Sequence, residues 1–179
     1  GEGCGNHPVD IGCMFMGESA LEMPETVRRR ATREEAHAHV DRAVSAGLVP
    51  MTGKVRYDND AFLIPDRKRL LAVCFCCHCC CMMRSYKHMP AAQLDEVMPR
   101  AEGFHLEVTD ACTGCGTCVS YCGWDAVRVE NGKAVHSGKC RGCGRCALHC
   151  PEKAVQITIR NPRAVEDVER RLLGYVKID

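Results

Sequence analysis

Apolar and polar residues alternate in two short stretches of the second half of the chain. Their apolar positions are Phe104, Leu106 and Val108 in the first stretch and Val155, Ile157 and Ile159 in the second. A period of two places such side chains on one face of a strand. We therefore predict strands at 104–108 and 155–159 that pair and close a small sheet.

A hairpin is predicted between these strands. Val127 and Val129 precede Asn131 and Gly132, and a second short apolar run follows at 134–135. An Asn-Gly pair between apolar runs is the best short-range hairpin signal, because both residues tolerate the positive φ of a tight turn.

Helical spacing dominates the first third of the chain. Thr32 and Glu35 form a capping box, and Gly47 stands where a left-handed C-terminal stop belongs. The apolar positions between them are Ala36, Val40, Ala43 and Val44. The spacing predicts a helix over 33–46. Residues 48–52 and 68–73 flank a polar stretch at 54–60 and predict a two-strand wing.

The C-terminal tail also has helical spacing. Its apolar positions are Val165, Val168, Leu172 and Leu173. They lie along one side of a short predicted helix within 163–179.

Half of the sixteen cysteines form two matched quartets. They are Cys112, Cys115, Cys118 and Cys122, then Cys140, Cys143, Cys146 and Cys150. Each quartet runs C-x-x-C-x-x-C-x-x-x-C, in which two-residue gaps let neighbouring thiolates reach different irons while the fourth ligand serves another cluster. Paired zinc sites and a disulfide scaffold are the alternatives. Zinc needs fewer cysteines than these runs supply, and matched quartets are not typical of disulfide pairing.

Residues 102–160 resemble the bacterial-type ferredoxin module with two [4Fe-4S] clusters. The resemblance implies crossed ligation, and Gly123 replaces the proline that the family usually places after the fourth cysteine of the first run. One cluster would be held by Cys112, Cys115, Cys118 and Cys150, and the other by Cys140, Cys143, Cys146 and Cys122. Single-electron transfer is the function that the resemblance implies.

The other eight cysteines lie upstream. They are Cys4, Cys13, Cys74, Cys76, Cys77, Cys79, Cys80 and Cys81. If 76–86 is helical, Cys76 and Cys80 share one face while Cys77 and Cys81 share the next. Neighbouring helical residues point about 100° apart, so these thiols cannot all converge on one small cubane. The open alternatives are further iron–sulfur clusters, a double or fused cubane, a zinc site and redox thiols. A further iron–sulfur cluster is the favoured expectation.

The upstream region is similar to cysteine-rich regions that precede ferredoxin modules in iron–sulfur oxidoreductases of anaerobes. The similarity rests on 33–47, on Leu48 and Val49, and on the C-x-C-C-x-C-C-C run at 74–81. It implies a bound cluster. His78, inside the run, is expected to tune a metal site or to face solvent, and the remaining histidines are expected at the surface.

These elements predict an α+β fold with three parts. Residues 1–100 form a cysteine-rich helix and hairpin domain, 101–162 a ferredoxin-like domain with two clusters, and 163–179 a C-terminal helix. The predicted function is iron–sulfur electron transfer. The alternative is a reductase with an unusual double or fused cluster at 74–81, and no catalytic residue is assigned.

Composition and charge limit the classes of partner. No apolar run approaches the length of a membrane span, and the formal net charge is only +1. Because the net charge is close to zero, nucleic-acid binding is not expected, although basic residues cluster at 28–30 and 67–69. The expected partners are redox proteins. The many retained thiols indicate a reducing cytoplasm, as in an anaerobe.

Overall fold

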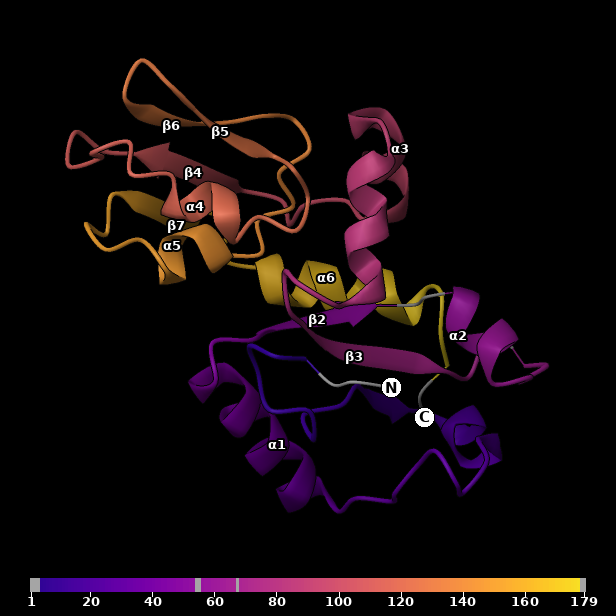
Figure 1. Ribbon diagram of the computed structural model, residues 1–179. Coiled ribbons are helices and arrows are strands. Elements are labelled where there is room, and N and C mark those ends of the chain that lie inside the picture. Colours follow the sequence, from indigo (N-terminus) through magenta and orange to yellow (C-terminus); the bar gives the residue numbers. More distant parts are fainter. Residues whose placement is uncertain (1–3, 54–55, 67, 178–179) are drawn as a thin grey trace. The chain divides into compact units, whose positions relative to one another are not determined.

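The computed structural model describes residues 4–53, 56–66 and 68–177. Lys54 and Val55 of the polar stretch and Arg67 of the second basic cluster lie outside these residues. The chain forms two compact units (Figure 1). Unit 1 comprises Gly1–His7 and Cys76–Ala164, and unit 2 comprises Pro8–Phe75 and Val165–Asp179.

Two strand pairs organise unit 1. β4 (Phe104–Val108) runs antiparallel to β7 (Val155–Ile159), with Phe104 opposite Ile159 and Val108 opposite Val155. The predicted pairing of these strands is confirmed. It brings together the two ends of the segment that contains both cysteine quartets.

The second pair is the predicted hairpin. β5 (Val127–Glu130) and β6 (Lys133–His136) are antiparallel neighbours. Asn131 and Gly132 have φ values of 49° and 74°, so both lie in the left-handed region that a two-residue type I′ turn requires. Val127 and Ala134 pack with Cys118 in a small buried cluster, which ties the hairpin to the first cysteine run.

Two short helices repeat the same local design. α4 (Thr117–Ser120) and α5 (Arg145–Leu148) each begin after a left-handed glycine, Gly116 or Gly144, with φ of 79° at both. Each helix follows the first cysteines of its run and precedes the fourth. Strand β5 follows the first run and strand β7 follows the second, so the order of cysteine loop, short helix and strand occurs twice.

The condition of a helix over 76–86, under which Cys76 and Cys80 would share one face, is not met. Cys76 ends strand β3 (Leu71–Cys76), the next residues form bends, and a 3-10 helix, η2 (Met82–His88), begins only after Cys81. The unbroken apolar run explains the difference, because it buries β3 through Cys76 and leaves no helical periodicity to follow. The α-helix α3 (Ala91–Val97) then leads toward β4.

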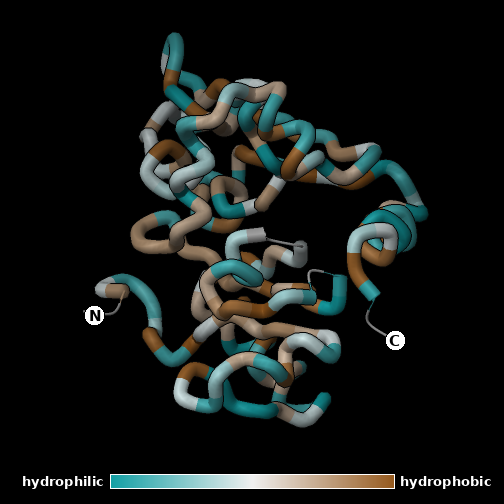
Figure 2. The backbone as a smooth tube through the Cα atoms, turned by 90° about the vertical axis from the view of Figure 1, so that its right-hand side faces the viewer, coloured by the Kyte–Doolittle hydropathy of each residue, from teal (hydrophilic) through white to brown (hydrophobic). Residues whose placement is uncertain are grey.

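Unit 2 contains a three-stranded sheet with β3 at its centre. β3 lies between β1 (Met14–Met16) and β2 (Val49–Gly53). The hydrophobic colouring of β3 in Figure 2 reflects its apolar sequence. The predicted wing strands are therefore neighbours. The three-residue β1 and the helix α2 (Arg56–Ala61) were not predicted, because both are too short to show a period.

Helix α1 (Arg33–Ser45) begins at the predicted capping box. The Glu35 amide donates to Thr32 Oγ1 over 3.2 Å, and the Thr32 amide donates to Glu35 Oε2 over 2.8 Å. Gly47 has a φ of 77°, as the predicted stop requires. A further 3-10 helix, η1 (Glu18–Glu22), follows β1.

The C-terminal helix is α6 (Ala164–Leu173). Beyond it Val176 is buried in unit 2, and the Lys177 amide donates to the Lys68 carbonyl over 2.6 Å. None of the helices in the described part of the chain combines the length and apolarity that a bilayer crossing requires.

Candidate metal centres

The first candidate centre is a cavity of about 330 Å³ in unit 1. The cysteines that line it are Cys112, Cys115, Cys118 and Cys150. Three of them come from the first run and its helix α4, and the fourth comes from the second run. The glycines of the first loop allow this wrapping. A Cβ at Gly114, whose φ is +68°, would lie 2.5 Å from the Gly132 carbonyl oxygen of the hairpin turn.

The second candidate centre is a cavity of about 340 Å³. The cysteines that line it are Cys122, Cys140, Cys143 and Cys146. Here the second run provides three cysteines and the first run provides one. Each run therefore contributes its fourth cysteine to the cavity of the other.

Backbone amides point at three of these sulfur atoms. The Ala126 amide donates to Cys122 Sγ and the Ala154 amide donates to Cys150 Sγ, each over 3.3 Å. The Ala134 amide donates to Cys112 Sγ over 3.4 Å. Amide hydrogen bonds to sulfur favour the thiolate form and are one of the means by which a protein tunes a cluster.

Burial works against ionisation of three further thiols in these cavities. Desolvation raises the pKa of Cys118 and of Cys140. Desolvation and the neighbouring thiolates raise the pKa of Cys146 to about 12. Four such sulfurs can lose their protons together only when a cation replaces them. The donor set and the cavities therefore fit iron–sulfur clusters.

Charged side chains distinguish the two cavities. Arg141 and Arg145 line the second cavity and are only 8% and 5% exposed. The Arg145 guanidinium donates to the Cys76 carbonyl, and Arg141 donates to Asp95 Oδ1 over 2.7 Å. Among the described residues that line the first cavity, Glu152 is the only charged one. The second cavity is therefore the more electropositive.

His136 also lines the second cavity. Both of its ring nitrogens are buried and lack a hydrogen-bond partner within the described structure. Desolvation lowers the pKa of this imidazole. The expectation that His136 is a surface residue is therefore wrong. His136 lies two residues after the buried Ala134 in β6, so strand alternation places both on the same face.

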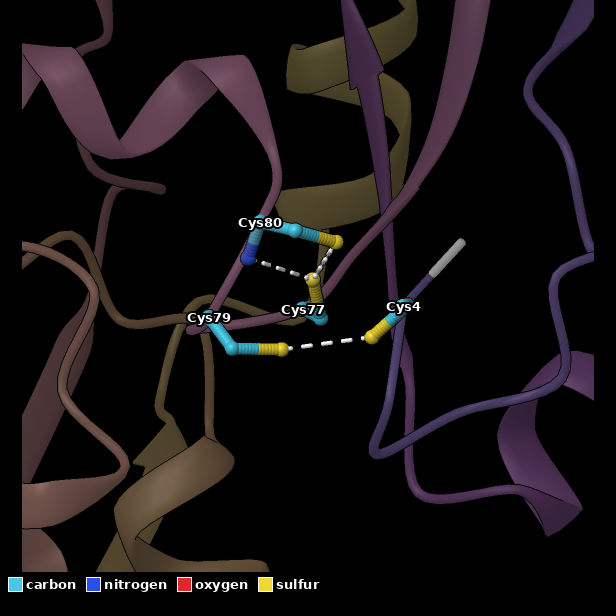
Figure 3. A group of neighbouring side chains, drawn as sticks. All are labelled: Cys4, Cys77, Cys79 and Cys80. Atoms are coloured by element: carbon cyan, nitrogen blue, oxygen red, sulfur yellow. Dashed lines mark hydrogen bonds between the residues drawn. The ribbon is translucent and has the colours of Figure 1, made fainter. Parts of the chain in front are cut away.

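The upstream cysteines include a compact quartet in unit 1. Its members are Cys4, Cys77, Cys79 and Cys80, whose Sγ atoms all lie within 4.8 Å of one another. Their side chains converge in Figure 3. The Sγ–Sγ distance is 3.1 Å for Cys77 and Cys80 and 3.3 Å for Cys4 and Cys79.

The other four upstream cysteines do not belong to this quartet. Cys76 and Cys81 form a pair with Sγ atoms 3.1 Å apart. Cys74 lies in β3 and Cys13 directly precedes β1, so both belong to unit 2. The structure thus divides the eight predicted ligands into a quartet, a pair and two cysteines of the other unit.

Hydrogen bonds within the quartet shift the pKa values of its thiols in opposite directions. Burial opposes ionisation of Cys77, but the side chain and amide of Cys80, together with Cys79, lower its pKa to about 6. The hydrogen bonds with Cys77 and Cys4 raise the pKa of Cys80. The sulfurs compete for shared protons, which a metal ion would replace.

A line of rings connects the quartet loop with the cluster loops. His78 lies beside Tyr121, with ring centroids 4.7 Å apart, and Tyr121 stacks on His149. Desolvation, Arg145 and the neighbouring histidines lower the pKa of His78. Sequence reasoning assigned no role to Tyr121, Arg141 or Arg145, because only tertiary packing brings them to the sites.

The comparison with protein families concerns the two cysteine runs. The model described as 4Fe-4S binding domain matches residues 107–128 and 134–156, and each matched stretch contains one cysteine run. No curated protein and no solved structure matched the chain. Residues 107–156 therefore carry a 4Fe-4S binding domain of the ferredoxin type, which supports an iron–sulfur electron-transfer role.

Proposed function

We propose that this chain is an electron-transfer protein with two [4Fe-4S] clusters in unit 1. The proposed ligands of one cluster are Cys112, Cys115, Cys118 and Cys150. The proposed ligands of the other are Cys140, Cys143, Cys146 and Cys122. One observation carries the proposal: each cavity is lined by three cysteines of one run and the fourth of the other.

Such clusters supply one-electron chemistry, because four thiolates leave no coordination position open for substrate. The chain's own residues keep the clusters in place and set their environment. The amides of Ala126 and Ala154 stabilise the crossed cysteines, and the short helices α4 and α5 hold each run in its loop. These features support electron transfer rather than substrate turnover.

A third metal centre at the upstream cysteines is part of the proposal. The convergence of Cys4, Cys77, Cys79 and Cys80 supports it. A further iron–sulfur cluster was the expectation from the sequence, and a double or fused cubane was its reductase alternative. No feature of the described residues favours the reductase over electron transfer.

The proposed partners are redox proteins. Residues 101–162 contain six acidic and seven basic residues, so they lack the negative surface with which many free ferredoxins steer toward partners. This balance supports a dedicated partner rather than many. A reducing compartment such as the cytoplasm of an anaerobe suits sixteen cysteines, none of which forms a disulfide in the described structure.

The crossed ligation can be tested by EPR on the full chain purified without oxygen. The two clusters are expected to contribute about eight irons per chain, four for each cluster. Cys150→Ser and Cys112→Ser should alter the same EPR signal. Cys122→Ser and Cys140→Ser should alter the other signal, and Cys13→Ser should alter neither.

Two results would contradict the proposal. If Cys150→Ser changed the signal that Cys140→Ser changes, each run would ligate its own cluster and the crossing would be wrong. If the oxygen-free protein contained zinc at both sites and no iron, the electron-transfer function would be wrong.

A further inference from the structure

The quartet of Cys4, Cys77, Cys79 and Cys80 is smaller than a cluster site. All four sulfurs lie within 4.8 Å of one another. Two of the separations are only 3.1 and 3.3 Å, between Cys77 and Cys80 and between Cys4 and Cys79. In Figure 3 the four side chains point toward a common centre from two segments of unit 1.

The size of the quartet distinguishes between kinds of metal centre. In a tetrahedral tetrathiolate site each sulfur lies about 2.3 Å from the ion, which places the sulfurs roughly 3.8 Å from one another. In a cubane each thiolate binds a different iron, so the four sulfurs stand farther apart. The sulfur separations in the quartet, from 3.1 Å to at most 4.8 Å, span the value for a single ion.

We infer that Cys4, Cys77, Cys79 and Cys80 bind one tetrahedral zinc ion. The inference deepens the third metal centre of the proposed function and is independent of the two clusters. Tetrahedral sites of four sulfurs are typical of zinc or of iron–sulfur centres, and a site that binds a single ion holds zinc more tightly than ferrous iron. All four positions are filled by protein, so the ion is structural.

The structural role follows from the chain positions of the ligands. Cys4 and Cys79 are 75 residues apart, and most of unit 2 lies between them in the sequence. The zinc fastens the N-terminal segment of unit 1 to the loop that follows β3. The Cys80 amide, which donates to Cys77 Sγ over 3.2 Å, supports one thiolate of the site.

The pair of Cys76 and Cys81 is not needed for this ion. Their sulfurs contact each other at 3.1 Å, and neither belongs to the group that lies within 4.8 Å. A double or fused cubane would recruit these two thiols as additional ligands. Replacement of Cys81 therefore distinguishes the two kinds of site, because a larger cluster would need this thiol and a single ion would not.

The test is metal analysis of the full chain, purified without oxygen from medium containing both zinc and iron. The wild type should contain about one zinc per chain. Cys4→Ser and Cys79→Ser should lose this zinc and retain the iron of the wild type. Cys13→Ser and Cys81→Ser are matched controls and should retain both metals. Retained iron shows that the variants still fold.

X-ray absorption at the zinc edge measures the geometry directly. The expected spectrum has four sulfurs at about 2.3 Å and no iron neighbour.

The inference is overturned if Cys4→Ser loses about four irons, as from a cubane. It is also overturned if Cys81→Ser loses the metal, if a single iron occupies the quartet, or if the zinc content is the same in wild type and all variants. Absence of the cluster iron from wild type would contradict the proposed function and leave the zinc result unaffected.

Discussion

The phenol ring of Tyr121 stacks on the imidazole ring of His149, with ring centroids 3.7 Å apart and planes 9° apart. Tyr121 directly precedes Cys122, and His149 directly precedes Cys150. The stack therefore joins the two points at which the cysteine runs cross to the other cavity. His78 lies against the same tyrosine and extends the contact to the upstream loop.

We expect Tyr121→Leu to release the clusters faster than the wild type. Stacked aromatic pairs contribute about 1 kcal/mol beyond their buried area, which corresponds to a roughly fivefold change in an equilibrium or rate. Tyr121→Phe retains the ring and is the matched control. The measurement is the rate at which visible absorbance bleaches in a chelator under mild denaturant. Equal rates for the two variants would show that the stack does not hold the crossing.

Replacement of Arg145 should lower the reduction potential of one cluster only. A buried cation favours the more negative, reduced form of a nearby cluster, so Arg145→Met should shift the potential at the second cavity downward. A tenfold change in the one-electron equilibrium corresponds to about 59 mV. The measurement is a potentiometric titration followed by EPR.

Arg128→Gln is the control for this experiment. Arg128 is exposed on β5, and its guanidinium pairs with Glu130. It should leave both potentials close to those of the wild type. An equal shift of both clusters in Arg145→Met would count against the electrostatic difference between the cavities.

Gly114 and Gly116 provide a matched pair for the first cysteine loop. Both have positive φ, +68° and +79°, so alanine is strained at either position. At Gly114 the new Cβ would also meet the Gly132 carbonyl oxygen at 2.5 Å, whereas nothing lies within 4 Å at Gly116. Gly114→Ala should therefore lose more of the first cluster than Gly116→Ala. Iron content and EPR intensity measure this, and equal losses would refute the contact.

Glu35 should make helix α1 sensitive to acid. Hydrogen bonds from the Thr32 amide and from Arg29 lower the pKa of this carboxyl. Because the folded pKa lies below the unfolded value of about 4.3, the stabilisation is present at higher pH and is lost as the pH falls through the folded pKa. Arg29→Gln should raise the midpoint of Glu35 in an NMR titration of its side-chain carbon, and Arg30→Gln should not. An unchanged midpoint in Arg29→Gln would exclude that ion pair.

Local signals predicted the elements that depend on neighbouring residues. The alternation around Leu106 and Ile157 predicted the strands β4 and β7, and Asn131-Gly132 predicted the hairpin. The capping box at Thr32 located the start of α1. Each of these signals acts within a few residues, and so it can be recognised before the tertiary structure is known.

Features that depend on distant residues could not be predicted in this way. The strand continues through Cys76, and the spacing of the cysteines, which was considered for a helix over 76–86, cannot show this. The approach of Cys4 to Cys79 requires a chain reversal over 75 residues. The burial of Arg145 and His136 similarly depends on which elements pack around them.

The exchange of fourth cysteines has a consequence for synthesis of the protein on the ribosome. A nascent chain that ends between Cys122 and Cys140 contains one whole run but lacks Cys150, so it has no complete set of sulfurs for either cavity. The second cavity has its four cysteines once Cys146 is made, and the first must wait for Cys150. Under the proposed crossed ligation neither half of the repeat can complete its cluster alone, and insertion of inorganic iron would be confined to the final stage of translation or later.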